Sequence, residues 1–226
     1  MPTHCTDDEV RDPWLPDRLL RTERDLLMPL LRRTPEEAYE LRTACPGWTA
    51  RQVLAHCGAA LVRIVEDRLE EGVFLPEANA CDVAEREDWP LGRILDELER
   101  GLTEAGPVIA GREDGRLDAV ALGEWVHAGD VREAFGAPDA YCGPSLDLAL
   151  PLLSVTSRRR ETPRLTGVLA DRAAPPVILG NEVEGRPAAT FRGEASTLIR
   201  IYAGRPLVRT RYELTGATEQ ELLIYR

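Results

Sequence analysis

The spacing of apolar residues changes near residue 142, and this change constrains the fold more than any other feature of the chain. Before that point, aliphatic side chains recur every three or four residues, which is the period of an amphipathic helix. After it, apolar runs are short and bounded by glycine or proline, which is typical of strands. The sequence therefore predicts an α+β protein in two parts, a helical one over residues 1–142 and a small mixed one over residues 143–226.

The first part is expected to form a helix bundle. It predicts a short helical piece after Pro35 and four longer helices, over residues 16–33, 50–71, 91–105 and 117–135. Thr49 is a candidate N-cap for the second of these helices, which we expect to end at Gly72 and Pro76. A polar stretch over residues 79–88 then leads to the third helix. Four helices with one longer crossover are the pattern of a four-helix bundle.

The second part alternates helix and strand patterns. Helices are expected over residues 146–155 and 196–202. Short strands bounded by glycine or proline are expected over residues 165–170, 177–179, 188–192 and 207–212.

Charged residues are also divided unevenly between the two parts. The net charge is −11, yet residues 1–142 carry 16 arginines against 30 acidic residues, and residues 143–226 carry 12 arginines against 9. The acidic balance argues against nucleic acid and anionic membranes as partners, while the positive second part suits an anionic substrate or the polar groups of a thiol cosubstrate. All 28 basic residues are arginine, which excludes a Schiff-base lysine or a P-loop lysine.

Cysteine usage and the N-terminal segment predict a cytoplasmic protein. The five cysteines are an odd number without a C-x-x-C pair, so neither a disulfide framework nor a structural zinc cluster is expected. The first 17 residues are acidic and lack an apolar core, so we expect no signal peptide, and no apolar run reaches the ~18–20 residues of a membrane helix. We expect a monomer or a weak dimer.

Two of the three histidines, His56 and His127, fall on the apolar stripes of two predicted helices. Glu124 shares the stripe of His127, three residues before it. A buried carboxylate without a partner is costly, so Glu124 needs a cation or a metal. A Glu-x-x-His pair on one helix with a histidine from a facing helix predicts a metal site in the core of a bundle, with one open position as catalytic zinc requires.

The segments around both histidines resemble one family. Residues 45–56 read CPGWTARQVLAH and resemble the PGWT-x-R-x-V-L-A-H segment of the mycothiol-dependent maleylpyruvate isomerase family. Residues 125–134 read WVHAGDVREA and resemble its V-H-x-x-D-[VI]-R-x-A segment. Residues 186–195 and 201–205 are similar to its C-terminal domain.

The resemblance implies a DinB-like four-helix domain that holds one divalent metal, usually zinc, and a sterol-carrier-protein-like C-terminal domain that closes over it. It also implies the thiol mycothiol as cosubstrate, used in isomerisation or S-transfer. The positions that match the family's metal-binding histidines are His56 and His127.

The carboxylate position departs from the family pattern. The family's carboxylate ligand usually lies four residues before the second histidine, where this chain has Gly123. Glu124 and Asp130 lie about 60° to either side of His127 on the helix. We expect Glu124, with its longer side chain, to be the third ligand. Asp130 is the alternative, either as that ligand or as an acceptor for an imidazole N–H, and a site that has lost its metal is the remaining alternative.

The expected function is therefore a metal-dependent enzyme with His56, His127 and Glu124 as its catalytic set. A metal held by these residues would generate a thiolate, which adds to an electrophile; loss of the thiol after rotation gives cis–trans isomerisation, and retention gives S-transfer. Arg132 is expected to bind the thiol cosubstrate, although it can instead pair with Asp130. The alternatives are a metal-dependent hydrolase that uses the same site, and a non-catalytic binding or regulatory protein that retains the fold.

Overall fold

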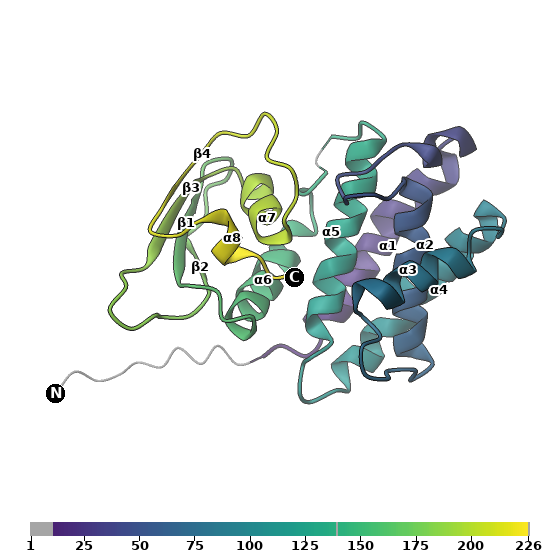
Figure 1. Ribbon diagram of the computed structural model, residues 1–226, viewed down its shortest axis with the longest axis horizontal. Helices are drawn as coiled ribbons and strands as arrows, with labels where there is room; N and C mark the ends of the chain where they lie inside the picture. The colour runs from purple at the N-terminus through teal and green to yellow at the C-terminus, as the bar shows by residue number, and fades with distance from the viewer. Residues whose placement is uncertain (1–10, 139, 226) are drawn as a thin grey trace.

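The computed structural model describes residues 11–138 and 140–225, so most of the segment used to judge a signal peptide lies outside the described residues. It confirms the α+β class, with a helical lobe followed by a mixed lobe (Figure 1). The helical lobe consists of α1 (Leu15–Arg33), a short 3-10 helix η1 (Glu36–Glu40), α2 (Ala50–Val65), α3 (Pro76–Glu85), α4 (Leu91–Ala110) and α5 (Asp118–Ala134).

Helices α1, α2, α4 and α5 form the predicted bundle. Helix α4 packs against α1 and α2, and α5 packs against the same two helices. Their buried faces carry mainly leucine, isoleucine, valine and alanine side chains. The amphipathic spacing read from the sequence is therefore the spacing that fills this core. Among the described residues, no helix has the length and the apolar character that crossing a bilayer would need.

Two helix ends of the bundle differ from the prediction, and the helix predicted over residues 146–155 of the second part continues to Arg159. Helix α2 ends at Val65 instead of near residue 71, because the apolar spacing stops there and Asp67 takes a left-handed conformation with φ of 55°. Helix α4 continues beyond residue 105 to Ala110, since the apolar face extends to the fully buried Ile109.

Helix α3 was expected only as a polar stretch. Pro76 occupies its first turn, where the missing N–H costs no hydrogen bond. The helix packs against α2, and its one buried residue is Asp82. Its sequence shows little amphipathic pattern because a charge, and not an apolar side chain, faces the bundle.

The second lobe is a four-stranded mixed sheet with two longer helices. Strand order is β2-β1-β3-β4; β1 pairs parallel with β3, and the two outer pairings are antiparallel. The elements are α6 (Leu146–Arg159), β1 (Leu165–Leu169), β2 (Val177–Leu179), β3 (Ala189–Gly193), α7 (Ala195–Ala203), β4 (Tyr212–Thr215) and α8 (Glu219–Leu222).

The last predicted strand is misplaced. Residues 207–211 form a turn in which the Thr210 N–H donates to the Leu207 carbonyl and Arg209 has a φ of 61°. A left-handed residue interrupts a strand, so β4 begins only at Tyr212 and pairs with β3. Helix α8, which follows it, was not predicted.

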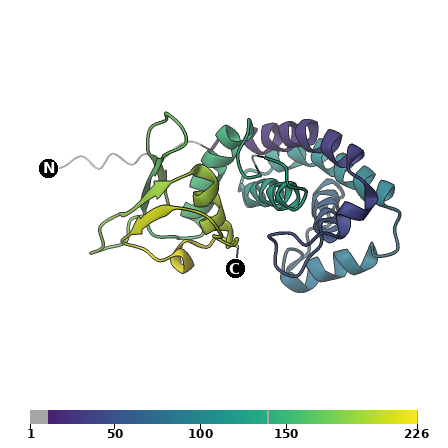
Figure 2. The same cartoon turned by 90° about the horizontal axis from the view of Figure 1, so that it is seen from above.

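The two lobes meet along α5 and α6. Helix α6 contacts α1 and α5 of the bundle as well as β2 of the sheet. Figures 1 and 2 show the sheet at the outer end of the second lobe, with α6 and α7 on its side nearer the bundle. Because α6 packs on both sides, the predicted boundary at residue 142 stays a prediction, as do the DinB-like and sterol-carrier-like assignments.

Candidate functional site

A cavity of about 380 Å³ lies between the two lobes and contains both predicted histidines. The helical lobe supplies His56 from α2 and Gly123, Glu124 and His127 from α5. The second lobe supplies side chains from three separate segments, Arg160, Arg205 and Tyr225. The cavity is therefore complete only when the lobes are docked.

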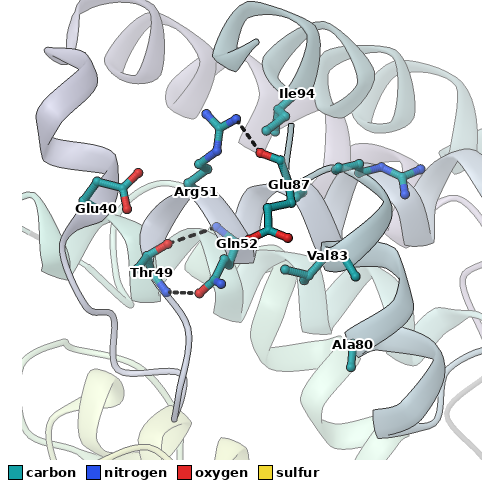
Figure 3. A pocket seen from close by; sticks show the side chains of 11 residues that line it. Glu40, Thr49, Arg51, Gln52, Ala80, Val83, Glu87 and Ile94 are labelled. Atoms are coloured by element: carbon teal, nitrogen blue, oxygen red, sulfur yellow. Dashed lines mark hydrogen bonds between the residues drawn. The ribbon is translucent and has the colours of Figure 1, made fainter. Parts of the chain in front are cut away.

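Local sequence holds His56 at the cavity. The Pro-Gly turn before α2 needs the left-handed Gly47, whose φ is 86°. Thr49 then forms a capping box with Gln52: each side chain accepts a hydrogen bond from the other residue's backbone N–H (Figure 3). His56 follows almost two turns later and is only 7% exposed.

The two imidazoles face each other. The ring centroids of His56 and His127 are 5.4 Å apart, with the planes nearly perpendicular at 84°. The indole of Trp48 packs against both, with centroid distances of 5.1 Å to His56 and 6.5 Å to His127. Two residues separated by 71 positions in sequence thus form one side-chain cluster, as the sequence predicted.

Asp130 orients His127 through a hydrogen bond at Nδ1. Nδ1 of His127 lies 3.1 Å from Oδ2 of Asp130, which is fully buried. Arg205 donates to both carboxylate oxygens, from Nε at 2.8 Å and from Nη2 at 2.7 Å, and the Tyr141 hydroxyl donates at 2.7 Å. Burial by itself would raise the pKa of Asp130, but the hydrogen bonds from His127 and Arg205 outweigh it and lower that pKa.

This network defines the roles of both residues. An ionised Asp130 can only accept hydrogen bonds, so Nδ1 of His127 carries the proton and Nε2 is left for a ligand. Burial lowers the pKa of His127, which keeps its imidazole neutral as ligation requires. Because both oxygens of Asp130 are already bonded, the structure favours Asp130 as the acceptor that orients the imidazole over Asp130 as a ligand.

Cys45 lies on the same side of His127 as Asp130. Among the described residues, Cys45, His127 and Asp130 are the one group of at least three potential metal ligands whose ligand atoms all lie within 4.8 Å of one another. The Arg205 guanidinium is bonded to Asp130 at the same place, so a cation there would meet a fixed positive charge. Burial also raises the pKa of Cys45 to about 11, which favours the thiol over the thiolate that metals bind.

Glu124 lies on the other side, toward α2. It is 5% exposed, and its Oε2 has no hydrogen-bond partner among the described residues. Burial raises its pKa to about 7, although the nearby His56 and a hydrogen bond with the Cys57 thiol lower it. An orphaned carboxylate oxygen beside two imidazoles fits the donor set that divalent zinc prefers. The ligand atoms of His56, Glu124 and His127 do not all lie within 4.8 Å of one another, so joint coordination requires a side-chain rotation.

Gly123 leaves a gap that the C-terminal segment fills. A Cβ at this position would lie 3.4 Å from the hydroxyl of Tyr225. That hydroxyl donates to the Ala119 carbonyl at 3.1 Å. Beside Gly123, the position four residues before His127, the cavity is thus lined by Tyr225 of the other lobe.

The arginines that line the cavity are not the one that the sequence predicted. Arg132 does not line the cavity, because its guanidinium pairs with the buried Glu23 of α1. Arg160, at the end of α6, lines the cavity together with Arg116 and Arg205. The sequence analysis included Arg205 only as part of a motif. No sequence signal predicts that Arg160 lines the cavity, because its position there depends on how the two lobes dock.

A second cavity, of about 390 Å³, lies between α2, α3 and α4 (Figure 3). Within the part of the chain that the structure describes, its lining contains neither histidine nor cysteine. Arg51 donates to the carbonyls of Glu87 and Trp89, and Arg86 forms a bidentate pair with Glu97. With these polar groups already satisfied, the cavity between the lobes is the better candidate for a functional site.

Two solved structures match the fold. They are the crystal structure of a mycothiol-dependent maleylpyruvate isomerase and that of the same enzyme with one histidine replaced by alanine. Each is 12% identical to this chain, covers 93% of it and 96% of its own length, and superposes with a TM-score of 0.56. No protein-family model and no curated protein matches the chain. The resemblance seen in short motifs thus extends to the architecture of both lobes.

Proposed function

We propose that this chain, which has the fold of the mycothiol-dependent maleylpyruvate isomerase, activates a low-molecular-weight thiol of the mycothiol type for addition to an electrophile. The observation that carries the proposal is the pair of buried imidazoles facing each other in the cavity between the lobes, with the orphaned Glu124 carboxylate beside them. Isomerisation and S-transfer both start from this addition.

His56, His127 and Glu124 are the residues that would hold a divalent metal, with zinc as the first candidate. Such a metal supplies one chemical effect, a lower pKa of a bound thiol, so that thiolate forms at neutral pH. The chain's own residues supply the rest. Asp130 and Arg205 keep Nε2 of His127 available.

The cavity is locally positive in an acidic protein. Arg116, Arg160 and Arg205 line it, whereas the chain carries a net charge of −11. Asp130 neutralises Arg205 and Asp114 pairs with Arg116 at 3.5 Å, whereas Arg160 is exposed. An anionic electrophile is therefore attracted to this cavity in preference to a cationic one.

One observation supports a second function, a non-catalytic protein that retains the fold. Gly123 removes the side chain best placed to join His127 at a metal, and Tyr225 fills the space beside it. A protein of this kind would bind a small molecule in the cavity without holding a metal. The cytoplasmic location and the monomeric or weakly dimeric state stay predictions, and Arg132, which pairs with Glu23 outside the cavity lining, is not part of the proposed site.

The test measures metal content and thiol dependence together. Purified protein is expected to carry about one zinc per chain and to isomerise maleylpyruvate only when mycothiol is present. His56→Ala is expected to remove most of the zinc and the activity. Full zinc content in His56→Ala would overturn the site, and zinc-dependent turnover without thiol would identify a hydrolase. A folded protein that binds no zinc and consumes no thiol would establish the non-catalytic alternative.

A further inference from the structure

Nδ1 of His56 is a buried polar atom without a hydrogen-bond partner among the described residues. An unpaired buried imidazole nitrogen costs free energy, and most buried polar side-chain atoms in native structures have a hydrogen-bond partner. A carboxylate oxygen lies just beyond hydrogen-bond distance, since Oδ2 of Asp82 is 3.9 Å from Nδ1.

Asp82 is an unusual residue for the place that it occupies. It is fully buried and is the one buried residue of α3, the helix that crosses over α2. Its two oxygens accept hydrogen bonds from both terminal nitrogens of Arg63, one of them at 2.7 Å. A buried ion pair is seldom more stabilising than apolar side chains of the same volume, so packing alone does not account for it.

The same arrangement stands behind the other histidine. His127 faces Asp130, which Arg205 holds with two hydrogen bonds. His56 faces Asp82, which Arg63 also holds with two hydrogen bonds, here from its two terminal nitrogens. Both aspartates are fully buried. The two imidazoles of the cavity are thus each backed by a carboxylate that an arginine fixes.

We propose that Asp82 is a positioning residue for His56. A small rotation of the imidazole closes the gap of 3.9 Å, so that Nδ1–H donates to Asp82 and Nε2 is directed away from α3. Arg63 prevents the carboxylate from turning elsewhere. The inference rests on the proposed function only for the identity of the ligand at Nε2, not for the tautomer of His56.

The experiment compares Asp82→Asn with Asp118→Asn. Asp118 is also buried and also forms a bidentate pair, with Arg11, but its ion-pair partners are arginines and not His56. Both variants therefore lose a buried carboxylate–guanidinium pair, and only one loses the partner of His56. In Asp82→Asn, Arg63 is expected to donate to the amide oxygen, which turns the amide NH₂ toward Nδ1 of His56. Nδ1 then accepts a hydrogen bond, which favours the tautomer protonated on Nε2.

Two measurements read the effect. Nitrogen NMR of the metal-free protein reports the His56 tautomer, and its signal is assigned with His56→Ala because the chain has three histidines. We expect one tautomer, protonated on Nδ1, in the wild type and in Asp118→Asn, and a changed tautomer in Asp82→Asn. Zinc competition should show an affinity ~10–100-fold weaker for Asp82→Asn and nearly unchanged for Asp118→Asn.

The outcomes separate this proposal from the proposed function. An unchanged His56 tautomer in Asp82→Asn would overturn the role of Asp82, even if His56→Ala still removed zinc. A changed tautomer in a protein that never binds zinc would support Asp82 and contradict the metal site. If Asp82→Asn does not fold, Arg63→Lys keeps the carboxylate and the opposite charge, and it should retain the wild-type tautomer.

Discussion

The two histidines of the cavity have similar partners but depend on different parts of the molecule. His56, Asp82 and Arg63 all belong to the helical lobe, on α2 and α3. His127 and Asp130 belong to the same lobe, but the arginine that fixes them, Arg205, comes from the segment after α7 in the other lobe. One imidazole can therefore be oriented by the bundle alone, whereas the other needs both lobes.

The histidine–aspartate distance is shorter in the group that spans both lobes. The contact from His127 to Asp130 is 3.1 Å, whereas the one from His56 to Asp82 is 3.9 Å. Tyr141 adds a further hydrogen bond to Asp130 at 2.7 Å. The array that spans the lobes is the tighter one, so docking of the second lobe contributes directly to the geometry of the site.

The largest expected effect separates ligand from support. Glu124 faces α2 and the His56 side, and Asp130 belongs to the His127 side. Glu124→Ala should weaken zinc binding by more than the ~10–100-fold typical of losing a supporting residue, and Asp130→Ala should stay within that range. Zinc affinities measured on the folded fraction of each variant test the difference. The reverse order would assign the ligand to Asp130.

The next effect concerns the lobes. Arg205→Ala leaves Asp130 buried without its main partner, which should cost about 3–5 kcal/mol in free energy of unfolding. Arg63→Ala should cost a similar amount, because Asp82 is equally buried. Denaturation curves give both values. NMR should show that Arg205→Ala disturbs His127 and leaves His56 unchanged; equal disturbance of both rings would show that the two arrays are not independent.

A smaller effect concerns pH. Burial raises the pKa of Glu124 from 4.5 to about 7. The folded metal-free protein therefore binds the proton more tightly than the unfolded chain, so stability falls as pH rises between these values, by roughly 3 kcal/mol at most. Glu124→Gln should remove this decline. Melting temperatures of both metal-free proteins between pH 5 and pH 8 provide the measurement, and parallel curves would contradict the raised pKa.

The smallest effect compares two glycines of α5. A Cβ at Gly129 would lie 2.5 Å from the Tyr141 ring and 2.6 Å from the Ala140 carbonyl oxygen, whereas a Cβ at Gly123 meets Tyr225 at an ordinary 3.4 Å. Gly129→Ala should destabilise the fold by about 1–3 kcal/mol and push Tyr141 from Asp130. Gly123→Ala should be neutral or stabilising by up to ~1 kcal/mol. Thermal unfolding distinguishes them, and equal values would contradict the close approach at Gly129.

Much of the site could be predicted from helical periodicity. Period and capping placed His56, His127 and Glu124 on inward faces of two helices, and the structure brings all three to one cavity. The same reasoning missed Asp82, because a buried charge in a polar helix gives no amphipathic signal. It also assigned Arg132 to the cosubstrate, although Arg132 pairs with Glu23 on α1, since side-chain partners across a bundle are not encoded in local spacing.

By itself, the sequence determined most of the local elements: a bundle of amphipathic helices, a mixed second lobe, and the two histidines on helix faces that must be buried. Only the tertiary structure decided which groups complete the site. Arg160, Arg205 and Tyr225 reach the cavity because the second lobe docks beside α5, and Asp82 faces His56 because α3 crosses over α2. Periodicity depends on neighbours a few residues apart, whereas these contacts join segments whose relative placement is set by packing of the whole chain.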